Sequence, residues 1–92
     1  MTILSGEAVR TAEGTVRQID LLNREMVVLV GDALLRFDVP PGCEVYLASE
    51  RVKLRLLQPS DRVRVTYTQR GGSPVASTIS ASWFLSAGDS RS

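Results

Sequence analysis

Five cationic side chains are the residues of this sequence whose types and spacing could do chemistry together. Arg51, Lys53 and Arg55 occupy every second position, and Arg62 and Arg64 repeat that spacing in the next segment. On an extended strand such residues share one face at a spacing of about 7 Å, which would let them follow the repeating phosphates of a nucleic-acid strand or meet another acidic partner. The alternative is an ordinary solvated strand face, and the sequence leaves both interpretations open.

The net charge of +1 hides a polarised molecule. Residues 51–70 carry six Lys or Arg side chains against one acid, a net of +5, whereas residues 1–50 carry four arginines against eight acids, a net of −4. Such a split favours association with a charged partner. Pairing of the acids with arginines across neighbouring strands is the alternative, and it would neutralise the split within the molecule.

Most catalytic and metal chemistry lacks its usual residues here. The sequence has no histidine and one cysteine, Cys43, which excludes histidine acid–base catalysis, Ser-His or Cys-His nucleophiles and the usual zinc ligand sets. Strand alternation places Cys43 inward, so we interpret it as a core residue and not as a reactive thiol. We expect no catalytic residue, no metal, no cofactor and no small-molecule substrate, and we predict that the protein is not an enzyme.

A second candidate surface lies near the end of the sequence, where Trp83, Phe84 and Leu85 follow one another. Alternation buries only one side of such a run, so at least one of the three is expected at the surface or under a partner. The cluster predicts a protein partner or self-association. The alternative is that Trp83 plugs one end of the fold and Phe84 covers its rim.

The spacing of apolar residues predicts an all-β fold. Short runs of Val, Leu and Ile are separated by turn residues at roughly 8–12 residue intervals, as in sandwiches and barrels. Because closure removes exposed strand edges, we predict a small antiparallel barrel of five or six strands. The expected strands include residues 13–20, 26–30, 33–39, 62–68 and 74–83, and residues 51–56 are expected to alternate between an apolar and a cationic face.

Turn residues give further expectations. Asn23 suits a left-handed position, Gly42 suits the positive-φ position of a type II turn, and Gly71-Gly72 indicates a hairpin. Gly14 indicates a bulge or a close backbone approach. Residues 1–12 remain open between an edge strand and a helical turn. We expect residues 1–92 to form one domain, with a core over about 13–84 and a polar tail over 86–92.

Two stretches carry a resemblance to known proteins. One is Gly-Thr-Val-Arg-Gln-Ile-Asp at 14–20, and the other is Leu-Gln-Pro-Ser-Asp-Arg-Val-Arg-Val-Thr-Tyr at 57–67, with Ser60 where glycine is commoner. Over about residues 13–81 the sequence resembles bacterial small β-barrel domains of the OB or SH3-like kind, many of them of unknown function. The resemblance implies a fold and transfers no catalytic or binding residue.

These observations predict a non-catalytic barrel that acts as a binding or assembly module. The alternative is a nucleic-acid-binding barrel that uses the arginine-rich face over residues 51–64. The first residues lack the basic and long apolar segments of a secretory signal, and no apolar run approaches a membrane span. We therefore expect a cytoplasmic protein that makes no contact with a membrane.

Overall fold

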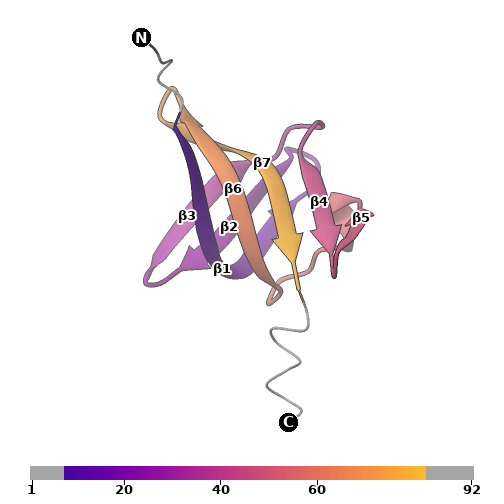
Figure 1. Ribbon diagram of the computed structural model, residues 1–92. Coiled ribbons are helices and arrows are strands. Elements are labelled where there is room, and N and C mark those ends of the chain that lie inside the picture. Colours follow the sequence, from indigo (N-terminus) through magenta and orange to yellow (C-terminus); the bar gives the residue numbers. More distant parts are fainter. Residues whose placement is uncertain (1–7, 83–92) are drawn as a thin grey trace.

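The apolar runs of the sequence become strands in the computed structural model, which describes residues 8–82 (Figure 1). Seven strands and one turn of 3₁₀ helix form within these residues. They are β1 (Val9–Asp20), β2 (Glu25–Val30), β3 (Ala33–Asp38), β4 (Glu44–Leu47), β5 (Glu50–Val52), η1 (Leu54–Leu56), β6 (Arg62–Arg70) and β7 (Ser73–Ala81).

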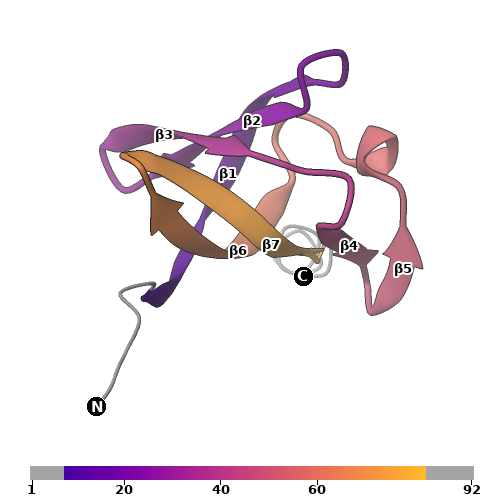
Figure 2. The same cartoon turned by 90° about the horizontal axis from the view of Figure 1, so that it is seen from above.

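Five of these strands close a barrel in the order β1-β2-β3-β7-β6. Antiparallel pairings join β1 to β2 and β6, β2 to β3, and β6 to β7. A short parallel pairing of Asp38 in β3 with Val75 in β7 completes the closure. Figure 2 looks down on the molecule and shows these strands enclosing a common interior. The predicted all-β barrel is confirmed, and its strand order is that of an OB barrel.

A hairpin of β4 and β5 extends the sheet beyond the barrel. β4 lies parallel to β7, with Val45 opposite Ile79, and β5 forms the outer edge (Figure 1). The barrel predicted as antiparallel therefore also carries two parallel pairings, β3–β7 and β4–β7. Because this hairpin and η1 fill the connection between β3 and β6, they bring residues 44–56 to the side of the barrel.

The barrel interior is filled by side chains at alternating strand positions. Phe37 is fully buried, and its ring meets that of Tyr67 edge to face with centroids 5.0 Å apart, a contact worth about 0.5–1.5 kcal/mol beyond burial. At Gly14 the close backbone approach is confirmed, because a Cβ there would collide with the Leu29 carbonyl group of β2.

The prediction of one strand over residues 51–56 is wrong beyond Val52. The amide of Leu56 donates to the Lys53 carbonyl at 2.9 Å, and the amide of Leu57 donates to the Leu54 carbonyl at 3.0 Å. Leu54 and Leu57 are buried, each 4% exposed, whereas Leu56 is 49% exposed. A spacing of three residues suits a 3₁₀ turn, so the core selects Leu54 and Leu57 in place of the alternating pair Leu54 and Leu56.

Four other local features differ from the predictions. The first strand, predicted over residues 13–20, begins at Val9, so residues 9–11, which the sequence left open, are strand. Arg24, not Asn23, takes the left-handed conformation, with φ 55°, and Gly42 has no positive φ, so its turn is not type II. The last strand, predicted over residues 74–83, contains a bulge in β7 that interrupts the alternation and places Ser77 outward.

Candidate functional site

The structure divides the five predicted cations between separate places. Arg51 lies on β5, Lys53 directly precedes η1 and Arg55 lies within it, whereas Arg62 and Arg64 lie on β6. Because the chain leaves the strand after Val52, no continuous cationic row forms across residues 51–55. Arg51 and Lys53 line one hollow, and Arg62 and Arg64 line another. Residues 83–85, the second predicted surface, lie outside the described residues.

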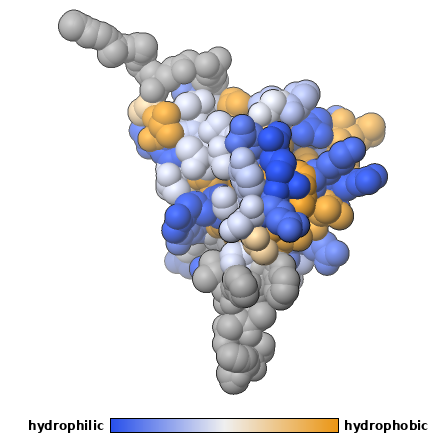
Figure 3. All heavy atoms as spheres, turned by 45° about the vertical axis from the view of Figure 1, so that its right-hand side comes forward, coloured by the Kyte–Doolittle hydropathy of each residue, from blue (hydrophilic) through white to orange (hydrophobic). Residues whose placement is uncertain are grey.

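We call the first of these the cationic hollow. It has a volume of about 250 Å³ and lies between the turn before β2, the turn after β3 and the β5–η1 segment. Figure 3 brings the side with β4 and β5 forward and shows strongly hydrophilic side chains beside hydrophobic ones there. The lining residues are Arg24, Pro41, Cys43, Val45, Arg51, Val52, Lys53 and Leu54.

Arg24 is held firmly at the edge of the cationic hollow. Its Nε donates to the Val39 carbonyl at 2.9 Å, while the Val39 amide donates to the Arg24 carbonyl at 2.8 Å. The preceding turn is fixed by Asp20, whose carboxylate accepts the amide and side-chain nitrogens of Asn23. These bonds support the left-handed backbone of Arg24, a conformation that costs free energy and is often found at functional sites.

Three cationic residues, Arg24, Arg51 and Lys53, therefore line the cationic hollow, and no acidic residue is among its lining residues. Within residues 8–82, no carboxylate lies within 4.0 Å of a cationic nitrogen of Arg24, Arg51 or Lys53. Glu44 is a nearby acid, but its carboxylate accepts the Tyr46 hydroxyl at 2.8 Å and does not line the hollow. Cations gathered around a partly enclosed space attract anions more strongly than single surface cations do.

Cys43 lies in the wall of the cationic hollow and is 6% exposed. Burial raises the pKa of its thiol to about 11 and is the largest effect on it. Arg24 and Arg51 lower this pKa, and Glu44 raises it. A thiol with this pKa is protonated at neutral pH and is a poor nucleophile and metal ligand. Its placement in the core agrees with the sequence interpretation.

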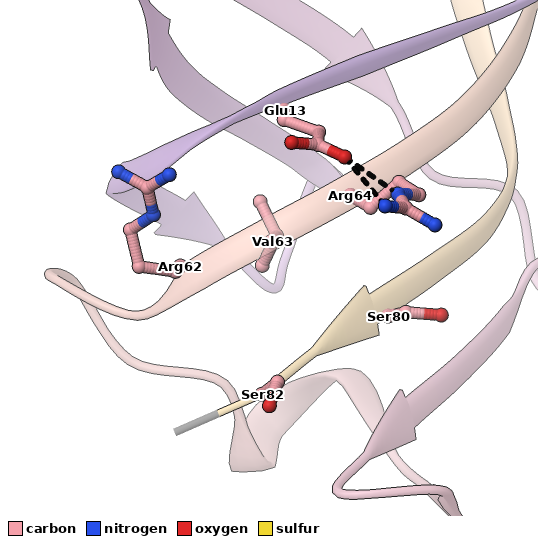
Figure 4. Close-up of a pocket in the computed structure, with 6 residues that line it drawn as sticks. All are labelled: Glu13, Arg62, Val63, Arg64, Ser80 and Ser82. Carbon is pink, nitrogen blue, oxygen red and sulfur yellow. Dashed lines mark hydrogen bonds and ion pairs between the residues drawn. The ribbon is translucent and has the colours of Figure 1, made fainter. Parts of the chain in front are cut away.

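The second space, which we call the outer hollow, has a volume of about 400 Å³ and lies on the outside of the barrel wall. Here Glu13 of β1 pairs with Arg64 of β6, whose NH2 nitrogen lies 2.7 Å from the Glu13 Oε2 (Figure 4). Arg62 points away from this pair. The lining residues are Glu13, Arg62, Val63, Arg64, Ser80 and Ser82.

Sequence reasoning missed Arg24 as a member of the site. It lies 27 positions before Arg51, and only barrel closure brings the turn before β2 towards the β5–η1 segment. A local signal was present, since Asn23 predicts a turn directly before Arg24. That signal gives no direction for the Arg24 side chain, which the hydrogen bond to Val39 determines.

The fold is similar to that of solved structures of CusF from Escherichia coli. Apo-CusF aligns with a TM-score of 0.68 and 19% identity, over 88% of this chain and 98% of that chain. A silver-bound form, Ag(I)CusF, aligns with a TM-score of 0.67 and 18% identity, over 80% of this chain and 97% of that chain. No family model and no curated protein matches this chain. At this level of identity the likeness establishes the fold.

The comparison corrects two predictions made from sequence. The function as an assembly module, or as a nucleic-acid-binding barrel, is wrong, because the similar structures are of a protein solved with Ag(I) and Cu(II). The cytoplasmic location is also wrong, because the resemblance to CusF does not support it. No helix among the described residues is long and apolar enough to cross a membrane.

Residues 8–82, which the structure describes, do not fit a silver or copper site of the usual kind. Soft ions such as Cu(I) prefer thiolate and thioether ligands, and imidazole suits copper more generally. The sequence has no histidine and two methionines; Met26 is fully buried in the core, and Cys43 is a protonated, buried thiol. Among residues 8–82, no three His, Cys, Asp or Glu side chains are placed to hold a metal ion.

Proposed function

We propose that this protein is a small-ligand-binding barrel whose ligand carries a carboxylate or phosphate group. The observation that carries the proposal is the cationic hollow, where Arg24, Arg51 and Lys53 face one space that no acid lines. Charge-assisted hydrogen bonds from guanidinium groups to such anions are stronger than neutral hydrogen bonds and have a defined geometry. The sequence, by contrast, predicts no small-molecule substrate.

Preorganisation supports the same proposal. A guanidinium group that is already positioned loses little conformational entropy when a ligand arrives. Arg24 meets this condition, because Nε is bonded to the Val39 carbonyl and the terminal nitrogens are left for a ligand. We propose binding without catalysis, which the absence of histidine supports.

The proposal also accounts for the mismatch with the metal-bound structures. Three cations beside Cys43 would repel a metal cation, whereas they would attract an anion. A similar barrel can bind a different ligand, because function depends on the residues of the site and not on the fold.

The test compares two exposed arginines of the predicted cationic set. The full chain is titrated with inorganic phosphate and with acetate at low salt, and binding is followed by NMR chemical shifts. Arg51→Gln, in the cationic hollow, is expected to weaken binding at least fivefold, whereas Arg62→Gln, in the outer hollow, is expected to change it less than twofold. Equal losses in both variants would indicate a diffuse charge effect and would refute a site at the cationic hollow.

A further inference from the structure

The cationic hollow is lined by two kinds of residues, cationic and apolar. The cations belong to the turn before β2 and to the β5–η1 segment, near the solvent. The remaining wall is apolar: Val45 is 2% exposed and Leu54 is 4% exposed, and Val52 packs against the same core cluster. The apolar wall is therefore the outer surface of the barrel core, and its side chains are fixed by packing.

This apolar wall offers few partners to a purely inorganic anion. The Cys43 thiol lies 3.8 Å from the Glu44 carbonyl oxygen, a long contact within hydrogen-bond range, and the side chains of Val45, Val52 and Leu54 carry no polar atom. Val45 and Leu54 are already almost fully buried, so a phosphate ion in contact with the cations would leave mainly the partly buried Val52 against water. An anion with an apolar body would cover Val52 and bury its own carbon atoms, and would so gain the free energy of burial.

The size of the cationic hollow limits the size of the apolar part of the ligand. Its volume of about 250 Å³ is below the roughly 300–1,000 Å³ of sites that take drug-sized ligands. The ligand is therefore expected to have only a few carbon atoms beside its charged group.

We propose that the ligand is a small organic acid, whose carboxylate or phosphate meets Arg24, Arg51 and Lys53 and whose apolar body lies against Val45, Val52 and Leu54. This inference rests on the proposed function and narrows its ligand class. Inorganic phosphate would contact only the cations and would leave the apolar wall uncovered. An uncharged molecule as long as the organic acid would lack the ionic contact with the cations that orients the acid.

The experiment is a titration of the full chain with acetate, butyrate, hexanoate, 1-hexanol and inorganic phosphate under the same low-salt conditions. Affinity is expected to rise about two- to fourfold for each added CH₂ between acetate and butyrate, up to the value for a fully buried methylene. Hexanoate is expected to bind at least tenfold more tightly than 1-hexanol. Phosphate is expected to bind about as weakly as acetate.

Two matched variants locate the apolar contact. Val52→Thr keeps the side-chain shape and places a hydroxyl in the apolar wall, so it is expected to reduce the hexanoate-to-acetate affinity ratio at least threefold, mainly by weakening hexanoate binding. Val9→Thr, on β1 and 68% exposed, is expected to leave the ratio unchanged.

The outcomes separate this inference from the function on which it rests. Equal affinities for acetate and hexanoate, or an unchanged ratio in Val52→Thr, would overturn the organic-acid inference and leave anion binding intact. Binding of 1-hexanol as tight as that of hexanoate would overturn the role of the cations. Absence of binding by every anion would overturn the proposed function together with this inference.

Discussion

The cationic hollow and the outer hollow both contain arginines that the sequence placed in a single cationic set, yet the two differ in charge and support. In the outer hollow, Arg64 is paired with Glu13, and both side chains are more than half exposed. In the cationic hollow, Arg24 is bonded to a backbone carbonyl and faces no acid. The comparison teaches that the number of cations in a segment says less about anion binding than the partners those cations already have.

The largest expected effect concerns the core beneath the cationic hollow. Leu54→Ala removes a buried side chain at the wall of this hollow and is expected to lower the free energy of unfolding by about 2–4 kcal/mol. Urea denaturation measures the loss. The matched control is Leu56→Ala in the same 3₁₀ turn, expected to cost under about 1 kcal/mol because Leu56 is exposed. Equal losses would show that the cationic hollow is not built on the core.

The second prediction separates the two hollows by their arginines. Arg24→Asn keeps a residue that tolerates the left-handed backbone and removes the cation, so butyrate affinity is expected to fall about ten- to thirtyfold, or about 1.4–2 kcal/mol. Calorimetric titration measures the change. Arg64→Asn is expected to change the affinity less than twofold, and a comparable loss there would erase the distinction between the hollows.

The third prediction uses the thiol in the wall of the cationic hollow. Its pKa is 9.0 without the fold and about 11 within it, so folding favours the protonated thiol. The resulting stability is complete below pH 9 and is lost as the pH rises through about 11. We expect a loss of roughly 1–2 kcal/mol over that interval, with partial solvation of the site reducing the full effect.

Urea denaturation at several pH values checks this loss, and Cys43→Ala supplies the control. In that variant the part of the decrease between pH 9 and 11 that belongs to the thiol is expected to vanish. The remaining decrease reports other groups that titrate in the same range, such as Tyr46, whose pKa is raised by its hydrogen bond to Glu44. An identical pH profile in the variant would show that the thiol is not desolvated by the fold.

The smallest expected effect lies in the outer hollow. Glu13→Gln removes the ion pair with Arg64, and because both side chains are largely exposed, the stability loss is expected to stay below about 1 kcal/mol. Thermal unfolding at low and high salt measures it, and the difference from the wild type is expected to shrink with added salt. A loss above 2 kcal/mol would mark the outer hollow as a structural element as important as the core.

Much of the fold follows from sequence because strand alternation is a local property. The inward positions of Phe37, Val63 and Val65 follow directly from it, as does the hairpin at Gly71-Gly72. Alternation fails where the backbone changes its period, as at η1, where burial follows a spacing of three residues. It also fails at the β7 bulge, where one extra residue turns Ser77 outward.

The candidate site was less accessible from sequence, since it depends on contacts between distant segments. Arg51 and Lys53 were identified as cations of interest, but their neighbour Arg24 was not, because barrel closure and the Val39 hydrogen bond place it. The pairing of Arg64 with Glu13 likewise depends on the β1–β6 register. The extent of the domain at residues 1–7 and 83–92 stays a prediction.

The most direct test follows Arg24 of the cationic hollow and Arg64 of the outer hollow in one experiment. In the ¹⁵N-labelled full chain, the Nε–Hε signals of Arg24 and Arg64 are followed by NMR during a titration with butyrate. We predict that the Arg24 signal shifts along a saturating curve while the Arg64 signal stays in place. A saturating shift at Arg64 with Arg24 unmoved would contradict the assignment of anion binding to the cationic hollow.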